Sequence, residues 1–114
     1  MPNKLLDKLE NVERRYQDVS HSLADPDTLG NPDKYNALAK ERADMEPIVT
    51  AFAALRDAES ELASSRELLA EDDEEIRAMA KDEIARLEHE IHTRREELQI
   101  MMLPKDPLDS HNII

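Results

Sequence analysis

The chain has 114 residues, enough for one domain with a modest core; 37% of its residues are charged and only 3% are aromatic. One glycine and no tryptophan exclude an ordinary sheet protein and favour long helices, so we expect an all-α fold. A net charge of −12 repels phosphate backbones, and three aromatic rings cannot stack a run of bases, so we expect no direct nucleic-acid binding by this domain.

The first predicted helix covers residues 3–23. Its apolar side chains recur at steps of three and four and therefore share one face: Leu5, Leu9, Val12, Tyr16, Val19 and Leu23. The next stretch, ADPDTLGNPDKY, is predicted to be a loop, because Pro26, Gly30 and Pro32 cluster there with Asp and Asn.

The second predicted helix covers residues 32–70. Asn31 provides an N-cap and Pro32 suits the first helical position. Two charged residues, Arg42 and Glu59, interrupt the face expected to be buried. The full face is Tyr35, Leu38, Arg42, Met45, Val49, Phe52, Leu55, Glu59, Leu62 and Leu69. Pro47 lies inside this pattern and predicts a kink near residues 44–46. Because the apolar register continues across Pro47, one kinked helix is preferred to two separate helices.

The third predicted helix covers residues 73–102. The acidic run AEDDEE marks the chain reversal before it, and Asp72 or Asp73 can cap the helix. Its predicted buried face is apolar apart from Arg94. The face consists of Ile76, Ala80, Ile84, Leu87, Ile91, Arg94, Leu98 and Met101 or Met102. Pro104 ends the helix.

These helices predict a three-helix antiparallel bundle with a long, kinked, coiled-coil-like hairpin. The first helix is the shortest, so it can cover only the half of the hairpin nearest Asn31 and Leu103. The far tip, around residues 62–79, is then a bare pair of helices, and no small-molecule pocket is implied. The same apolar seams also fit an open coiled coil that pairs with another chain.

No residue pattern indicates catalysis or a cofactor. His89 and His92 are three residues apart, but neither forms the Glu-x-x-His pairs of a di-iron bundle, so solvated histidines are preferred to a metal site. The chain lacks cysteine, a signal peptide and an apolar run of the roughly 18 residues that span a membrane, so we expect a soluble, cytoplasmic protein. The basic island at 92–95 fits either a helix C-terminal bias or a partner contact.

The run Leu103, Pro104, Lys105, Asp106 and Pro107 predicts a stiff inter-domain linker, because each proline disfavours helix in the residue before it. Residues 1–103 would form the helical domain, and 104–114 the linker and the start of a strand in a main body that lies beyond this sequence. This run, followed by DSHN and two isoleucines, resembles the junction of bacterial peptide chain release factor 1 rather than that of release factor 2. The helix segments KLENVERRYQDV and DEEIRAMAKDEIARLE are similar to that family as well.

The resemblance implies a factor that reads UAG and UAA on the ribosome and promotes hydrolysis through a Gly-Gly-Gln tripeptide. No such tripeptide occurs in the sequence. Pro26, Asp27 and Thr28 match the Pro-x-Thr form of the codon-reading element, but the resemblance places that element in a later domain. This domain would then be a docking arm toward the stalk base of the large subunit, near the GTPase release factor.

Two other interpretations remain, a free-standing coiled-coil adaptor or chaperone and a metal-binding helical enzyme. The first predicts a stop codon soon after Ile114 and a stable oligomer. The isolated domain can also bury an exposed seam against a second copy of itself.

Overall fold

The computed structural model describes residues 3–103, and every regular element in this range is helical. In chain order these are α1 (Asn3–Leu23), α2 (Pro26–Leu29), α3 (Pro32–Glu67), the short 3-10 helix η1 (Leu68–Ala70) and α4 (Glu74–Met101). The predicted all-α fold with a long helical hairpin is confirmed. No helix in this range is both long and apolar enough to cross a membrane.

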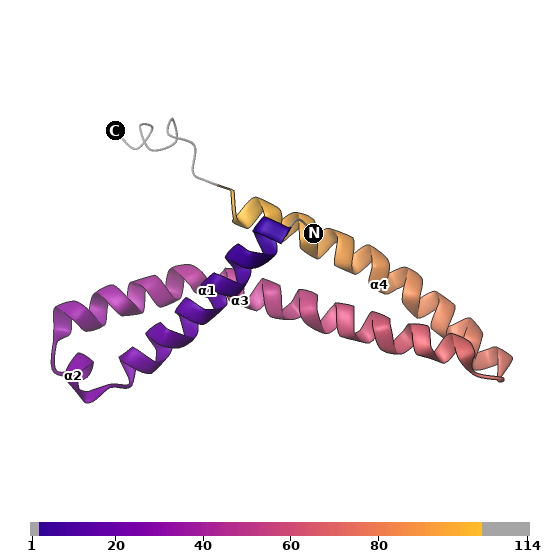
Figure 1. The fold of residues 1–114 in the computed structure, drawn as a ribbon, viewed down its shortest axis with the longest axis horizontal. Coiled ribbons are helices and arrows are strands. Elements are labelled where there is room, and N and C mark those ends of the chain that lie inside the picture. The colour runs from indigo at the N-terminus through magenta and orange to yellow at the C-terminus, as the bar shows by residue number, and fades with distance from the viewer. Residues whose placement is uncertain (1–2, 104–114) are drawn as a thin grey trace.

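The helix α3 is the spine of the molecule (Figure 1). The helix α1 runs antiparallel along the first half of α3, where Arg15 contacts Glu41 and Glu13 contacts Arg56. The helix α4 runs antiparallel along the second half, so two helix pairs extend from the middle of α3 in different directions. The molecule measures 62 × 40 × 21 Å, and its radius of gyration is 19.7 Å. A compact domain of this length would have a radius of gyration of about 13 Å.

The third long helix covers less of α3 than the sequence suggested. The helix α4 has 28 residues and α3 has 36, so the end of α4 lies beside the middle of α3 rather than near Asn31. Only there do all three long helices meet, in a cluster that we call the junction core. Its central side chains are fully buried: Leu9 of α1, Phe52 and Leu55 of α3, and Leu98 of α4.

The α3–α4 hairpin keeps a heptad register. Arg66 contacts Glu88 at 3.4 Å, and Glu59 contacts Arg95 at 3.0 Å. Each pair is displaced from the other by seven residues on both helices, which is the repeat of a coiled coil. Along α4, Ala80, Leu87, Ile91 and Leu98 are buried, and all four belong to the predicted seam.

Three residues predicted in the buried stripes are exposed instead: Tyr35, Leu69 and Ile76. All three lie at outer ends of the helix pairs, where no neighbouring turn remains to cover them. Ala58 and Ser65 were not assigned to the buried face of the second predicted helix. Both are buried, because their small side chains allow close approach of the helices. Burial therefore depends on the neighbour as well as on side-chain polarity.

The charged interruptions of the predicted seam lie at its edges. Arg42 is half-buried: its guanidinium carbon is 4.8 Å from the centroid of the Tyr16 ring, and its Nε donates to the Ser20 hydroxyl. Glu59 is exposed and accepts from Arg95. Each of these charged groups thus lies at the edge of the seam and has a polar partner on the neighbouring helix.

The predicted loop between the first two long helices contains the short helix α2, which corrects that prediction. Asp25 caps it by accepting from the backbone N–H of Asp27 at 2.9 Å, and Pro26 occupies the first turn. This Asp-Pro-Asp start repeats the Asn31-Pro32-Asp33 start of α3, a signal that the cluster of turn residues obscured.

The helix α3 continues across Pro47 as one helix, as predicted, and Figure 1 shows its change of direction. Proline has no N–H to donate to the carbonyl of Ala43, so one helix bond is absent. The ring itself is exposed, whereas Ile48 packs against the junction core. Packing of α3 on both partner helices therefore holds the bent helix together.

Replacing Asn31 by alanine should lower the free energy of unfolding by about 1 kcal/mol, because its Oδ1 accepts from the backbone N–H of Lys34 at 3.2 Å. Asn36→Ala is the matched control: Asn36 is exposed within α3, where alanine favours helix. Urea unfolding followed by circular dichroism measures both variants. Equal stability of the two variants would contradict a capping role for Asn31.

Candidate functional site

The basic island at 92–95 is paired with carboxylates of its own domain. Within residues 3–103, no group of three or more His, Cys, Asp or Glu side chains is arranged to hold a metal ion. In the basic island, His92 lies 2.9 Å from Glu96, Arg94 contacts Glu90 and Arg95 contacts Glu59. A carboxylate therefore accompanies each of these basic side chains.

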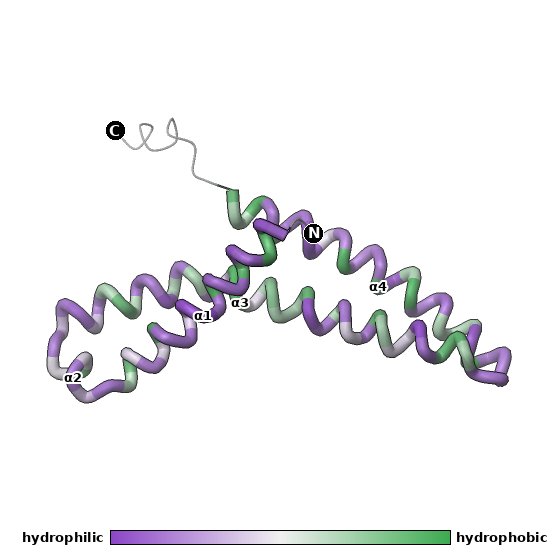
Figure 2. Tube along the Cα trace, viewed as in Figure 1, coloured by the Kyte–Doolittle hydropathy of each residue, from purple (hydrophilic) through white to green (hydrophobic). Residues whose placement is uncertain are grey.

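Large apolar side chains are exposed at the ends of the described chain's helix pairs. The groups are Leu29 and Tyr35 near α2; Leu68, Leu69, Ile76 and Met79 at the α3–α4 turn; and Ile100, Met101 and Leu103 at the end of α4. Figure 2 shows a hydrophilic turn at the far end of the hairpin and a hydrophobic end of α4. Of these groups, the one at the turn includes a groove.

This tip groove has a volume of about 470 Å³ and lies between the last turns of α3 and the first turns of α4. Its lining consists of Ser65, Leu68, Ile76, Met79, Ala80 and Glu83. Met79 is 72% exposed, whereas Ala80 is buried. The groove is open to solvent and is lined mainly by apolar side chains, so it suits an apolar group inserted from another molecule.

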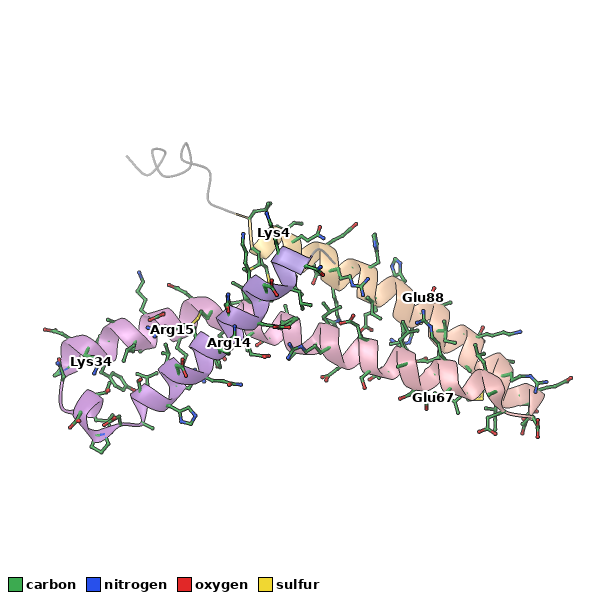
Figure 3. All side chains as sticks on the ribbon, viewed as in Figure 1. Lys4, Arg14, Arg15, Lys34, Glu67 and Glu88 are labelled. Carbon is green, nitrogen blue, oxygen red and sulfur yellow. The ribbon has the colours of Figure 1, made fainter. Side chains whose placement is uncertain are left out.

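The surroundings of the tip groove are strongly acidic. Residues 61–83 contain nine carboxylates and three basic side chains. Two of those bases are engaged nearby: Arg66 contacts Glu88, and Arg77 donates to the backbone carbonyl of Glu71 at 2.6 Å. Figure 3 labels Glu67 and Glu88 on this part of the hairpin. The tip therefore disfavours phosphate groups and favours a partner with positive charge.

The carboxylate of Glu83, which lines the groove, is held in its charged form. The hydrogen bond from Arg86 lowers the pKa of Glu83, and the charge of Arg86 acts in the same direction. Arg86 also contacts Glu90 at 3.1 Å and approaches Glu61 of α3 at 3.9 Å. The groove thus combines apolar side chains with a carboxylate that is ionised at neutral pH.

Sequence reasoning placed a bare tip here but assigned Leu69 and Ile76 to the core. The signal against that assignment was the acidic run at 71–75. Asp73 caps α4 by accepting from the backbone N–H of Glu75 at 2.8 Å, so the chain reverses at this run. Close to this reversal fewer neighbouring turns are present to cover a side chain, and Leu69 and Ile76 remain exposed.

The predicted linker residues lie mostly outside the described range. Leu103 is described and is 66% exposed, whereas Pro104, Lys105, Asp106 and Pro107 lie beyond residue 103. Their linker role and the domain boundary at 103 remain predictions. The structure does describe Pro26, Asp27 and Thr28, where the Thr28 side chain is buried at the end of α1–α3.

Comparison with known proteins identifies the family. The model of the PCRF domain family matches residues 12–114, nearly the whole chain. The chain belongs to the PCRF domain family. This PCRF domain is 38% identical over 107 residues to "Peptide chain release factor 1" of Oleidesulfovibrio alaskensis (strain ATCC BAA-1058 / DSM 17464 / G20). The alignment covers 94% of this chain and 30% of that relative. No solved structure matches the chain.

The resemblance to release factors that the sequence indicated is therefore confirmed, and the chain is a domain of the peptide chain release factor type. It spans 30% of the length of the relative it matches. In the described residues this PCRF domain is elongated and helical, and it has an apolar groove with acidic surroundings at one tip.

Proposed function

We propose that this domain is the ribosome-docking arm of a factor that terminates translation at UAG and UAA in the cytoplasm. In this proposal the hairpin tip contacts the stalk base of the large subunit, close to the GTPase release factor. The observation that carries the proposal is the exposed tip groove on a domain of the release factor family. Hydrolysis is assigned to another part of the factor, since the sequence has no Gly-Gly-Gln tripeptide, and codon reading to the later domain that the resemblance implies.

The shape of the domain supports a role in docking. At about 1.5 Å per residue, the 36 residues of α3 extend over roughly 54 Å along the bent helix. The junction core stabilises the middle of α3, and the Glu59–Arg95 and Arg66–Glu88 contacts join the two helices toward the tip. The domain can therefore present a small apolar surface at a distance from its own core.

The chemistry of the tip supports a ribosomal protein as the immediate contact. Apolar side chains such as Leu68 and Met79 gain free energy when they leave water, and they supply affinity in a protein interface. The surrounding carboxylates attract basic surfaces and repel RNA phosphates. The tip thus suits a basic protein at the base of the stalk better than bare RNA.

Deleting residues 1–103 from the full-length factor should weaken ribosome engagement or recycling, because the docking contact is lost. We expect a loss of about tenfold in apparent affinity for the ribosome, which corresponds to about 1.4 kcal/mol of binding free energy. The rate of peptide release at saturating factor should survive the deletion. Peptide release by ribosomes stalled at a UAA codon, measured over a range of factor concentrations, separates the two effects.

A deletion protein that is well folded yet fails to release peptide at any concentration would contradict the proposal. Circular dichroism and thermal unfolding of the deletion protein provide the folding control. A second control is the same titration with a Gly-Gly-Gln variant, which should lose the release rate and retain ribosome binding.

A further inference from the structure

The end of α4 carries a second exposed apolar surface, which we call the end patch and define as Ile100, Met101 and Leu103. Their exposed fractions are 68%, 42% and 66%. The neighbouring Leu98 is fully buried, and Met102 packs against the junction core. The end patch therefore continues the core outward onto the surface, as the hydrophobic end of α4 in Figure 2 illustrates.

The charge pattern separates the end patch from the rest of the surface. Only two stretches of seven or more residues lack Asp, Glu, Lys and Arg, namely 47–55 and 98–104. The first supplies Phe52 and Leu55 to the junction core, so burial explains its lack of charge. The stretch 98–104 includes Ile100, Met101 and Leu103, which no described residue covers. An uncharged, exposed apolar surface of this kind indicates a contact with another part of a protein.

The position of the end patch indicates which contact it makes. Ile100 and Met101 lie on the last turn of α4, and Leu103 is the first residue of the predicted linker, so any domain that follows is tethered next to the patch at high effective concentration. The relative from Oleidesulfovibrio alaskensis is more than three times as long as the stretch aligned with this chain. The acidic tip groove differs in its charge and lies at the opposite end of α4.

We propose that the end patch packs against the domain that follows residues 104–114 in the longer factor. Ile100 and Leu103 would enter an apolar surface of that domain, and this contact would fix the direction of the docking arm. Such a contact would be a modest inter-domain interface, of the size that allows defined orientations without fusing two cores. The inference does not depend on where the hairpin tip binds.

Single-cysteine labelling tests this proposal, since the present chain contains no cysteine. Ile100→Cys is compared with Met79→Cys in a longer factor from which any other cysteines have been removed. The two positions are matched: both lie on α4, and their side chains are 68% and 72% exposed in this domain. The rate of reaction with a maleimide reagent, without ribosomes, is divided by the rate in denaturant to remove intrinsic differences.

We expect the thiol at position 100 to react about tenfold or more slowly than the thiol at position 79, since burial in an interface limits access of the reagent. Leu103→Cys should show the same protection. Comparable rates at positions 79 and 100 in the longer factor would overturn the proposal. All three substitutions replace exposed side chains, so the variants should fold normally.

The same pair of variants in the 114-residue chain identifies what covers the patch. Equal rates at the two positions there would support the following domain as the occupant. Protection of position 100 that is independent of concentration would instead assign the cover to residues 104–114. Protection that grows with concentration would assign it to a second copy. Either form of protection would overturn the proposal.

Adding ribosomes separates this inference from the proposed function. If the hairpin tip docks, ribosomes should slow the reaction of Met79→Cys. The protection of Ile100→Cys is measured before any ribosomes are added. One result can therefore fail without affecting the other.

Discussion

Phe52→Ala is expected to lower the free energy of unfolding of this domain by about 3–5 kcal/mol. Phe52 is 1% exposed and belongs to the junction core, the place where all three long helices meet. Its ring also lies beneath Arg56, whose guanidinium carbon is 4.1 Å from the ring centroid. In so thin a molecule, removing the ring leaves a cavity at the place where the three long helices pack together.

Phe52→Leu is the matched control, because it keeps most of the buried volume and removes only the aromatic ring. We expect it to cost less than about 1.5 kcal/mol. Urea unfolding monitored by helical circular dichroism, with the m-value checked for each variant, measures both changes. A loss below about 1 kcal/mol for Phe52→Ala would show that the junction core contributes little to the stability of the domain.

The double substitution Leu68→Asp and Met79→Asp is expected to weaken binding of the full-length factor to ribosomes by about 10- to 100-fold. Both side chains line the tip groove, where Leu68 is 42% and Met79 72% exposed. The change removes the apolar contact that the proposed docking requires. It should leave the stability of the domain within about 0.5 kcal/mol of the original, as is usual for exposed positions.

Leu29→Asp tests whether the effect is specific to the tip. Leu29 is 59% exposed and lies at the other outer end of the molecule, so it adds a carboxylate to an exposed apolar site without touching the groove. Equilibrium binding of labelled factor to ribosomes provides the dissociation constants. If the tip variant binds as tightly as the Leu29 variant, the groove does not take part in docking.

The sequence predicted the long helices because their apolar steps of three and four are regular and their caps are explicit. Asn31 and Asp73 both cap helices as their positions indicated, and α3 crosses Pro47 without breaking. The short helix α2 was missed because four residues are too few to show a period. Its only signals were Asp25 and Pro26, which also occur in loops.

The pairing of the helices was harder to predict than their existence. An apolar stripe shows which face of a helix is buried but not which neighbour covers each turn. The sequence therefore placed Tyr35 and Ile76 in the core, although both lie at outer ends of the helix pairs and are exposed. The bare tip followed from helix lengths alone. Its groove depended on small residues such as Ser65 and Ala80, whose burial only the packed hairpin reveals.

The shared spine α3 gives the two ends of the domain separate stabilities. The helices α1 and α4 meet only around the junction core, so each outer half of α3 depends on a different partner. The outer turns of one helix pair can open without disturbing the other pair, because within residues 3–103 the ion pairs between helices join α3 to α1 or to α4, and none joins α1 to α4. Opening the junction core, in contrast, separates all three helices at once. A partner that grips the hairpin tip would then suppress local fraying there and leave the fluctuations of the α1–α2 end unchanged.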